Sequence, residues 1–414
     1  MHKFCIMWLI MLRISWGEVS YEGYKLFNIW PQNEDIKSQL LNLMRVRPDF
    51  YDLWKLHRGL VSSMSVSVAP AGLDELSSFL HHYNTTHEIT IPDIMEAVNV
   101  EKKWHDLMRR RRMQRTMWKS VHDSYRTVDE INQALHLYAK KFPFINLENL
   151  GNTSEGRPIF ALRISKNDTR PLIWIDAGIH AREWIAPASV LYLIDKLLTR
   201  GGQSLLEKHQ FLIVPLVNPD GYDYTHKTAR LWRKNRSKIP GEPCVGVDLN
   251  RNFPLKWGTG AGNSPDACDE TFRGVEPASE LESKALIRRM NDLKGEIILY
   301  LNLHSYGQYI LTPYGFMRYH YPKNYPNMMR LAKMVRDKIQ ERHQYVYQIG
   351  SASDLLYEAS GGVDDYVAGV LNVPYTFTIE LCDEGRYGFL LPPSYIRPVG
   401  EQLWTAIKVF SKNI

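Results

Sequence analysis

The sequence predicts an α/β protein in two units, a small α+β domain followed by a larger domain whose central sheet is covered by helices on both sides. Three observations support this prediction. The chain has 414 residues, more than one typical domain, and 44% of them are hydrophobic, enough for a large core. Residues 18 to about 100 alternate short strand-like and helix-like segments. From about residue 116, helix-like segments alternate with strands that are apolar on both faces.

The first seventeen residues, "MHKFCIMWLIMLRISWG", resemble a secretory signal peptide. Lys3 precedes a short apolar run, and the segment ends on a small residue, although Arg13 interrupts the run. The alternative is a buried N-terminal strand. No later run reaches the roughly eighteen apolar residues that a membrane span needs, so no span is predicted. Four glycosylation sequons are compatible with secretion, at Asn84, Asn152, Asn167 and Asn235.

Residues 18 to about 100 show the order β-α-β-β-α-β, which is typical of a ferredoxin-like sandwich. Alternating apolar residues predict the strands, and helical spacing predicts the helices. The strands are expected in "YKLFNIW" (24–30), "FYDLWKL" (50–56), "SMSVSVAP" (63–70) and "HEITI" (87–91), and the helices in "EDIKSQLLNLM" (34–44) and "LDELSSFLHHY" (73–83).

A polar, helix-like segment follows and ends in "RRRRMQR", residues 109–115. Such a basic cluster between two folded units is expected to be exposed, which makes it a target for trypsin-like or furin-like proteases. A simple charged linker explains it equally well. The net charge of +6 is modest, and the densest basic run is confined to this stretch, so nucleic acid binding is not predicted.

The second unit contains four very apolar strands, and a polar residue follows each of them. Sites in α/β proteins form at such strand ends. The strands are "LIWIDAG" (172–178), "FLIVPLV" (211–217), "IILYLNL" (297–303) and "YTFTIEL" (375–381), and the polar residues are His180, Asn218, His304 and Glu380.

His180 and Glu183, in "DAGIHAREWIAP", are three residues apart and can reach one ion from the same turn. A catalytic zinc takes three protein ligands and leaves a position for water. The isolated pair is common by chance, so it needs a third ligand, which His304 could supply. Asp248 could accept the free N–H of a ligating imidazole. Each of these residues taken alone is more often structural.

Of the four cysteines, Cys5 would be removed together with the signal peptide. Cys244 and Cys268 bracket a loop rich in Pro, Gly and Asn and could form a disulfide in an oxidising compartment. Cys382 then remains unpaired, and a lone cysteine is more often a buried small hydrophobe than a nucleophile.

A series of motifs in order resembles the zinc metallocarboxypeptidases of the A/B type, over nearly all of residues 116–414. This resemblance implies a three-layer α/β/α sandwich with a mixed central sheet, one zinc ion, and a zymogen whose activation domain (18–115) is cut in the basic cluster. The motifs are "EGRPI", "IHAREW", "VNPDGY", "LWRKNRS", "CVGVDLNRNF", "LNLHSYGQ", "LTPYGF", "YEASGGVDD", "TIEL" and "GRYGFLLP".

The resemblance also assigns the catalytic residues. It makes His180, Glu183 and His304 the zinc ligands, a donor set known in this family. Asp248 supports His180. Glu380 becomes the general base that activates water and returns a proton to the leaving amine, and Arg233 stabilises the oxyanion.

An exopeptidase must also recognise the free C-terminus of a peptide or protein substrate. A guanidinium can bind a carboxylate through two parallel hydrogen bonds. The resemblance gives this role to Arg251 with Asn250, supported by Tyr357 and Arg182, and it adds Tyr306 to the substrate-binding residues.

The pocket for the last side chain decides specificity. The resemblance places Asp364 at its floor, where B-type enzymes have aspartate, and the small residues Gly315 and Ala352 at its walls. A buried carboxylate favours a cation, so release of C-terminal Lys or Arg is predicted. The neighbouring Asp365 leaves the register open, and an A-type or broad specificity is the alternative.

Other functions explain the sequence less well. A serine hydrolase of the G-x-S-x-G type and a zincin of the H-E-x-x-H type both lack their motif. A catalytically silent homologue that acts as a binding protein would be expected to lose part of the constellation, which is complete. The sequence therefore predicts a secreted, monomeric zinc carboxypeptidase zymogen.

Overall fold

A computed structural model describes residues 18–58, 62–112, 122–260 and 262–414. The predicted leader, residues 1–17, and the end of the basic cluster, residues 113–115, lie outside the described residues. Among the described residues, no helix is long and apolar enough to cross a membrane.

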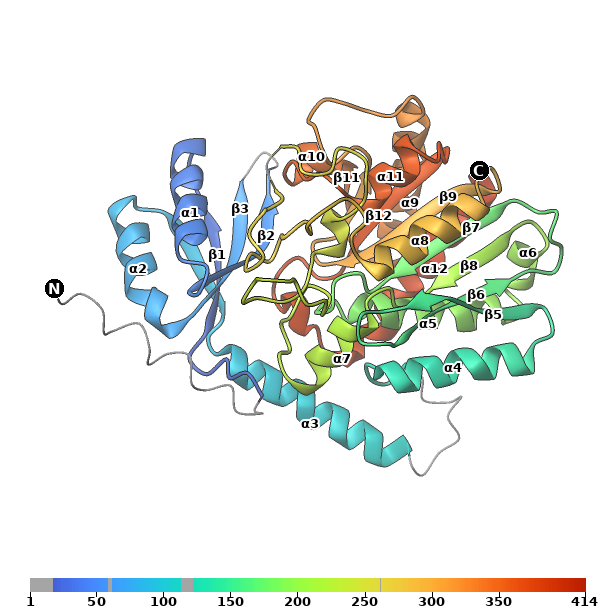
Figure 1. The fold of residues 1–414 in the computed structure, drawn as a ribbon, viewed down its shortest axis with the longest axis horizontal. Helices are drawn as coiled ribbons and strands as arrows, with labels where there is room; N and C mark the ends of the chain where they lie inside the picture. The colour runs from blue at the N-terminus through green and yellow to red at the C-terminus, as the bar shows by residue number, and fades with distance from the viewer. Residues whose placement is uncertain (1–17, 59–61, 113–121, 261) are drawn as a thin grey trace.

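The first unit is a four-stranded antiparallel sheet in the order β2-β3-β1-β4, with two helices on one face (Figure 1). The ferredoxin-like prediction is confirmed. Helix α1 begins where the Asn33 side chain accepts from the Ile36 N–H, and it buries Ile36, Leu40 and Met44 at helical spacing. The elements are β1 (Lys25–Trp30), α1 (Glu34–Val46), β2 (Tyr51–His57), β3 (Ser63–Val68), α2 (Leu73–His82) and β4 (Thr86–Ile91).

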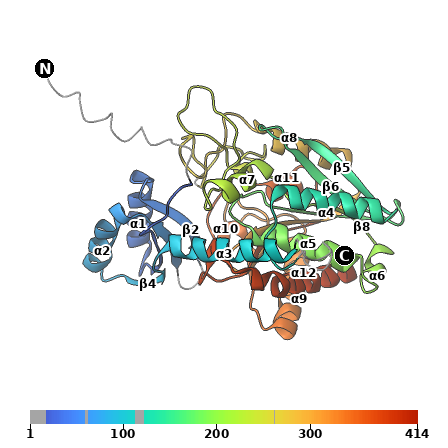
Figure 2. The ribbon, with the colours of Figure 1, turned by 90° about the horizontal axis from the view of Figure 1, so that it is seen from below.

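Helix α3 (Ile94–Arg112) connects the two units and runs along the edge of the larger one (Figures 1 and 2). Ile94 and Val98 are buried in a cluster with Leu231 and Phe389 of the second unit. Glu101 forms a buried ion pair with Arg230. The connecting helix is therefore bound to the second unit through both apolar and charged contacts.

The second unit contains an eight-stranded mixed sheet in the order β11-β10-β12-β9-β7-β8-β6-β5. The central strands β12, β9, β7 and β8 are parallel to one another, whereas β10, β6 and β5 introduce antiparallel pairs. The strands are β5 (Ile145–Asn152), β6 (Pro158–Ile164), β7 (Leu172–Ala177), β8 (Gln210–Val214), β9 (Ile297–Ser305), β10 (Tyr309–Thr312), β11 (Gln348–Ser351) and β12 (Tyr375–Leu381).

Helices cover both faces of this sheet. One large apolar core joins the sheet to α4, α5, α9 and α12, and a second core joins its other face to α8 and α11. The three-layer prediction with a mixed sheet is therefore confirmed. The helices are α4 (Val128–Lys141), α5 (Ile185–Leu197), α6 (Gln203–Leu206), α7 (Pro219–Lys227), α8 (Leu281–Asp292), α9 (Tyr325–His343), α10 (Ala352–Leu355), α11 (Val363–Gly369) and α12 (Ile396–Asn413).

Candidate active site

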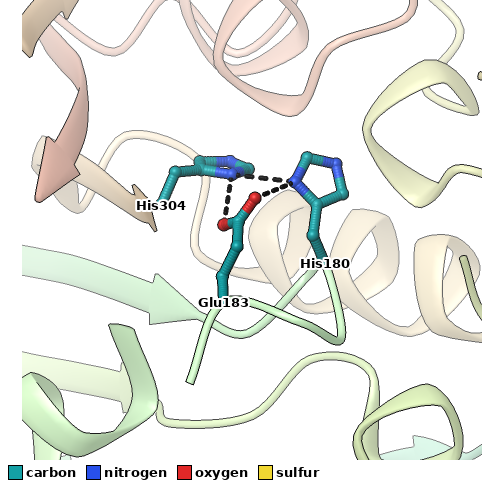
Figure 3. Close-up of side chains that lie close together, drawn as sticks. All are labelled: His180, Glu183 and His304. Carbon is teal, nitrogen blue, oxygen red and sulfur yellow. Dashed lines mark hydrogen bonds and ion pairs between the residues drawn. The ribbon is translucent and has the colours of Figure 1, made fainter. Parts of the chain in front are cut away.

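Three of the predicted side chains meet at the carboxyl ends of β7 and β9 (Figure 3). His180 Nδ1 lies 2.8 Å from Glu183 Oε1, and His304 Nδ1 lies 3.0 Å from Glu183 Oε2. The two Nδ1 atoms are 3.1 Å apart. All three residues are buried, and their ligand atoms lie within 4.8 Å of one another. Two imidazoles and one carboxylate that converge in this way fit a zinc ion, because this is one of its known catalytic donor sets.

The chain reaches this geometry through the turn after β7. Gly178 has a φ of +66°, and a Cβ there would fall 2.7 Å from the Leu216 side chain, so only glycine fits. His180 and Glu183 follow within this turn, just before α5 begins at Ile185. His304 is the penultimate residue of β9.

Asp248 lies behind His180, as the sequence predicts. Its Oδ1 is 3.2 Å from His180 Nε2, and its Oδ2 accepts two hydrogen bonds from the Arg233 guanidinium. Burial alone would raise the pKa of Asp248, but Arg233 and Arg251 hold it well below its usual range. A permanently ionised Asp248 fixes the orientation of the His180 ring.

Glu380 is next to the metal-binding cluster because β12 pairs in parallel with β9, with Glu380 opposite His304. It lines the same cavity as His180, Glu183 and Arg233. Burial raises the pKa of its carboxyl to about 7. A general base must lie next to the reacting groups, and the Glu380 carboxylate does so because it lines the same cavity as the metal-binding cluster.

The cavity wall contains the predicted carboxylate-binding group. Arg251 is held by its Nε, which donates to the Gly262 carbonyl at 2.6 Å, and by an NH1 group that donates to the Asn250 carbonyl. The other guanidinium nitrogen lies 3.3 Å from the Tyr357 hydroxyl oxygen. Asn250 Oδ1 accepts from the Val363 N–H, which links this group to the start of α11.

The two adjacent acids of α11 point to different places. Asp364 lines the cavity with Gly315 and Ala352, and it accepts a hydrogen bond from Thr378 Oγ1 at 3.2 Å. Asp365 is fully buried and accepts from the backbone N–H groups of Gly315 and Phe316. Asp365 therefore supports the pocket wall, whereas the Asp364 carboxyl faces the cavity.

Strand β2 of the first unit lines one part of this cavity, and no sequence signal predicted which of its residues enter. Trp54, Lys55 and Leu56 all contribute to the lining. Asp52 accepts from Arg182 NH1 at 2.7 Å, and Arg182 also stacks on the Phe389 ring. Tyr306, another predicted substrate-binding residue, lines the cavity beneath this strand.

Other predicted residues lie outside the cavity lining. Cys244 and Cys268 form a disulfide. Cys382 is buried and hydrogen-bonds to Gln402 of α12. Asn218, a polar residue after an apolar strand, caps α7 by accepting from the Gly221 N–H, so its role here is structural.

A glycan at the Asn235 sequon does not fit the structure. The Asn235 side chain is fully buried, its amide donates to Glu280 and its carbonyl oxygen accepts from the Val247 N–H. A glycan cannot be attached to an amide enclosed in this way, so no sugar at this position crowds the substrate groove. The other three sequons, at Asn84, Asn152 and Asn167, are exposed.

Comparisons with known proteins agree with this geometry. Residues 131–406 match the zinc carboxypeptidase family, and residues 27–101 match the carboxypeptidase activation peptide. The chain belongs to the zinc carboxypeptidase family. It is a metallocarboxypeptidase, its cofactor is zinc, and its first unit is an activation domain of the kind found in zymogens.

Relatives of both specificity types are similar to this zinc carboxypeptidase. Carboxypeptidase A1 of Rattus norvegicus is 33% identical over 405 residues, covering 96% of this chain and 95% of the relative. Carboxypeptidase B of Astacus astacus is 39% identical over 303 residues, covering 72% of this chain and 98% of the relative.

Two solved structures share the complete arrangement of both units. The structure of thrombin activatable fibrinolysis inhibitor is 30% identical with a TM-score of 0.83, and covers 95% of this chain and 98% of its own. Carboxypeptidase A from Helicoverpa armigera is 28% identical with a TM-score of 0.86. The match covers 96% of this chain and 98% of the chain in that structure. Since A-type and B-type enzymes are both similar, specificity must be argued from the pocket.

Proposed function

We propose that this carboxypeptidase is a secreted zymogen that, once activated, releases C-terminal Lys or Arg from peptides and proteins. The observation that supports this specificity best is the position of Asp364, whose carboxyl faces the cavity and has no cationic partner among the described residues. An unpaired buried carboxylate favours a substrate that brings a cation.

We assign the zinc ligands to His180, Glu183 and His304, with Asp248 fixing the His180 ring. Zinc, when bound there, polarises the scissile carbonyl group and lowers the pKa of a water molecule. The Ser305 N–H donates to Glu183 Oε2 at 3.1 Å and so holds the Glu183 carboxylate in position to bind zinc.

Glu380 and Arg233 handle the proton and the charge in this proposal. Glu380 takes the proton of the attacking water and delivers it to the leaving amine nitrogen. Arg233 lies at the cavity wall with its orientation set by Asp248, so its guanidinium can stabilise the negative charge that develops on the carbonyl oxygen.

The free C-terminal carboxylate binds to Arg251, Asn250 and Tyr357, which places the scissile bond near Glu380. Gly315 and Ala352 are small and leave space above Asp364 for a long side chain. An A-type or broad preference would follow if Asp364 stayed protonated with substrate bound, because a neutral floor accepts apolar side chains.

Activation requires removal of the first unit in this proposal. Residues 1–17 are the signal peptide, residues 18–115 the activation domain and residues 116–414 the catalytic domain. A trypsin-like or furin-like protease cuts within residues 109–115, of which Arg109 and Arg110 are exposed at the end of α3. The enzyme is a monomer.

The deciding experiment uses trypsin-activated protein and matched acyl dipeptides that end in Arg, Phe or Glu, with and without phenanthroline. Chelator-sensitive release of Arg far above Phe supports both the zinc site and the role of Asp364. Preference for Phe keeps the enzyme class but contradicts the B-type assignment. N-terminal sequencing of the activated protein locates the cut.

A further inference from the structure

Lys55 extends from the activation domain into the catalytic cavity, close to the metal-binding cluster. Its Nζ lies over two aromatic rings of the catalytic domain, 5.9 Å from the centre of Tyr306 and 5.5 Å from that of Tyr309. It donates a hydrogen bond to the Glu384 carbonyl at 3.2 Å. Among the described residues, these partners of the ammonium group all belong to the other unit.

An irregularity in β2 directs Lys55 toward these partners. Leu53 pairs with Val66 and Lys55 with Ser65, so Trp54 is an extra residue in the strand. In a regular strand, Lys55 would share a face with Leu53, which packs on the core of the activation domain. The extra residue reverses this alternation, and Lys55 points at the catalytic domain instead.

The receiving surface is suited to a cation. Tyr306 and Tyr309 are buried beneath β2, and their ring faces carry the negative side of the aromatic quadrupole. The side chains of Glu384, Asp383 and Glu380 add negative charge around Lys55. A Cβ at Gly307 would fall 2.4 Å from the Tyr309 ring and 3.5 Å from Lys55 Cε, so glycine keeps this ring face open.

The same surface lies on the path of the substrate. Asp364 and Arg251 occupy the part of the cavity that receives the last residue, and Trp54, Lys55 and Leu56 cover another part. When the activation domain leaves, the peptide chain before the scissile bond must pass over the surface that β2 now covers. In the zymogen, Lys55 therefore occupies the place that a substrate side chain takes in the activated enzyme.

We propose that Tyr306, Tyr309 and the Glu384 carbonyl form a cation subsite that, in the activated enzyme, binds the side chain of a lysine or arginine one or two residues before the C-terminal residue of the substrate. This inference rests on the proposed function, because it needs an active enzyme that accepts a C-terminal Arg. It adds a second position at which the enzyme selects a cation.

The test measures kcat/KM of the activated, zinc-loaded enzyme on acyl tetrapeptides that end in Arg. The parent peptide is acyl-Ala-Ala-Ala-Arg. Four others carry lysine or norleucine at the second-last or third-last position, and norleucine matches the apolar length of lysine without its charge. The readout is the lysine-to-norleucine ratio at each position, so overall changes in activity cancel within each enzyme.

We expect a lysine-to-norleucine ratio of about five to ten at one of the two positions. This is the gain expected when a desolvated cation binds over aromatic rings. Tyr309→Phe keeps the ring and should keep the ratio, whereas Tyr309→Leu should bring it close to one. Glu384→Gln, a change of an exposed side chain, should lower it about twofold at low salt because it removes a nearby charge.

A ratio close to one at both positions in the wild-type enzyme would overturn the subsite, and so would a ratio that Tyr309→Leu leaves unchanged. If Tyr309→Leu gives no folded enzyme, an unchanged ratio in Glu384→Gln overturns it. The parent peptide separates the two proposals. Failure to release Arg from it contradicts the proposed function, whereas release without a lysine preference contradicts only the subsite.

Discussion

Replacing Asp364 with asparagine should remove the preference for basic C-terminal residues while leaving the shape of the pocket almost unchanged. The Asp364 side chain is only 7% exposed, and its one hydrogen bond to a described side chain comes from Thr378. An asparagine carbonyl can accept the same bond. The change therefore removes the charge that a Lys or Arg side chain would meet, with little other effect.

The size of the effect follows from the burial of the carboxylate. Truncating one partner of a buried, hydrogen-bonded charge pair costs about 2–5 kcal/mol, and we take about 3 kcal/mol because the neutral amide still accepts a hydrogen bond. At 1.36 kcal/mol for each factor of ten, kcat/KM for an Arg dipeptide should fall roughly 150-fold. The value for the matched Phe dipeptide should stay within about threefold or rise.

Asp365→Asn is the matched control. Because Asp365 accepts from two backbone N–H groups of the pocket wall, its loss should lower activity on Arg and Phe dipeptides alike and leave their ratio unchanged. The role of Asp364 is refuted if Asp364→Asn lowers kcat/KM equally for the Arg and Phe dipeptides. It is also refuted if Asp365→Asn changes the ratio of the two kcat/KM values instead. The second result would assign the pocket floor to the wrong acid.

Three further predictions test the proton transfer, the zymogen contact and the electrostatics of the fold. Glu380→Gln should lower kcat by about 10²–10⁴-fold without changing the zinc content measured by atomic emission, and a drop in bound zinc would instead make Glu380 structural. Asp52→Asn removes the charge that pairs with Arg182 at 2.7 Å, so the uncut zymogen should hydrolyse a small substrate roughly tenfold faster, and equal rates would contradict an inhibitory role for this pair. Burial raises the pKa of Glu282 from 4.5 to about 8, so the folded state binds its proton more tightly than the unfolded state and stability falls as pH rises between these values. Glu282→Gln should make the melting temperature less dependent on pH between pH 5 and 8. If this pH dependence is unchanged, other groups dominate it.

The fold could be predicted largely because its strands are strongly patterned. The four apolar runs of the second unit correspond to β7, β8, β9 and β12, and each is so uniformly buried that no helix or loop fits it better. The ends of three of these strands contribute His180, His304 and Glu380 to one cavity. Parallel neighbours end at the same edge of a sheet, so this convergence follows once β12, β9 and β7 are known to be parallel neighbours, which the structure shows.

The contacts between the two units could not be predicted in the same way. Whether Lys55 faces its own core or the catalytic cavity depends on one extra residue in β2, and nothing in "FYDLWKL" distinguishes a bulged strand from a regular one. Asn235 is a different case, because its contacts lie within the second unit. Its sequon has the pattern of an exposed loop, but the side chain forms hydrogen bonds inside the fold with residues distant in sequence.

These inter-unit contacts predict that cutting the chain and activating the enzyme are separate events. Asp52, Lys55 and Glu101 all precede the basic cluster, and their partners Arg182, Tyr309 and Arg230 all follow it. A cut within residues 109–115 breaks none of these contacts. Because Glu101 and Arg230 are buried together, separating them requires α3 to leave the catalytic unit and water to enter. We therefore expect the substrate path to open only when the activation domain dissociates, and the strength of these contacts to set how long that takes after cleavage.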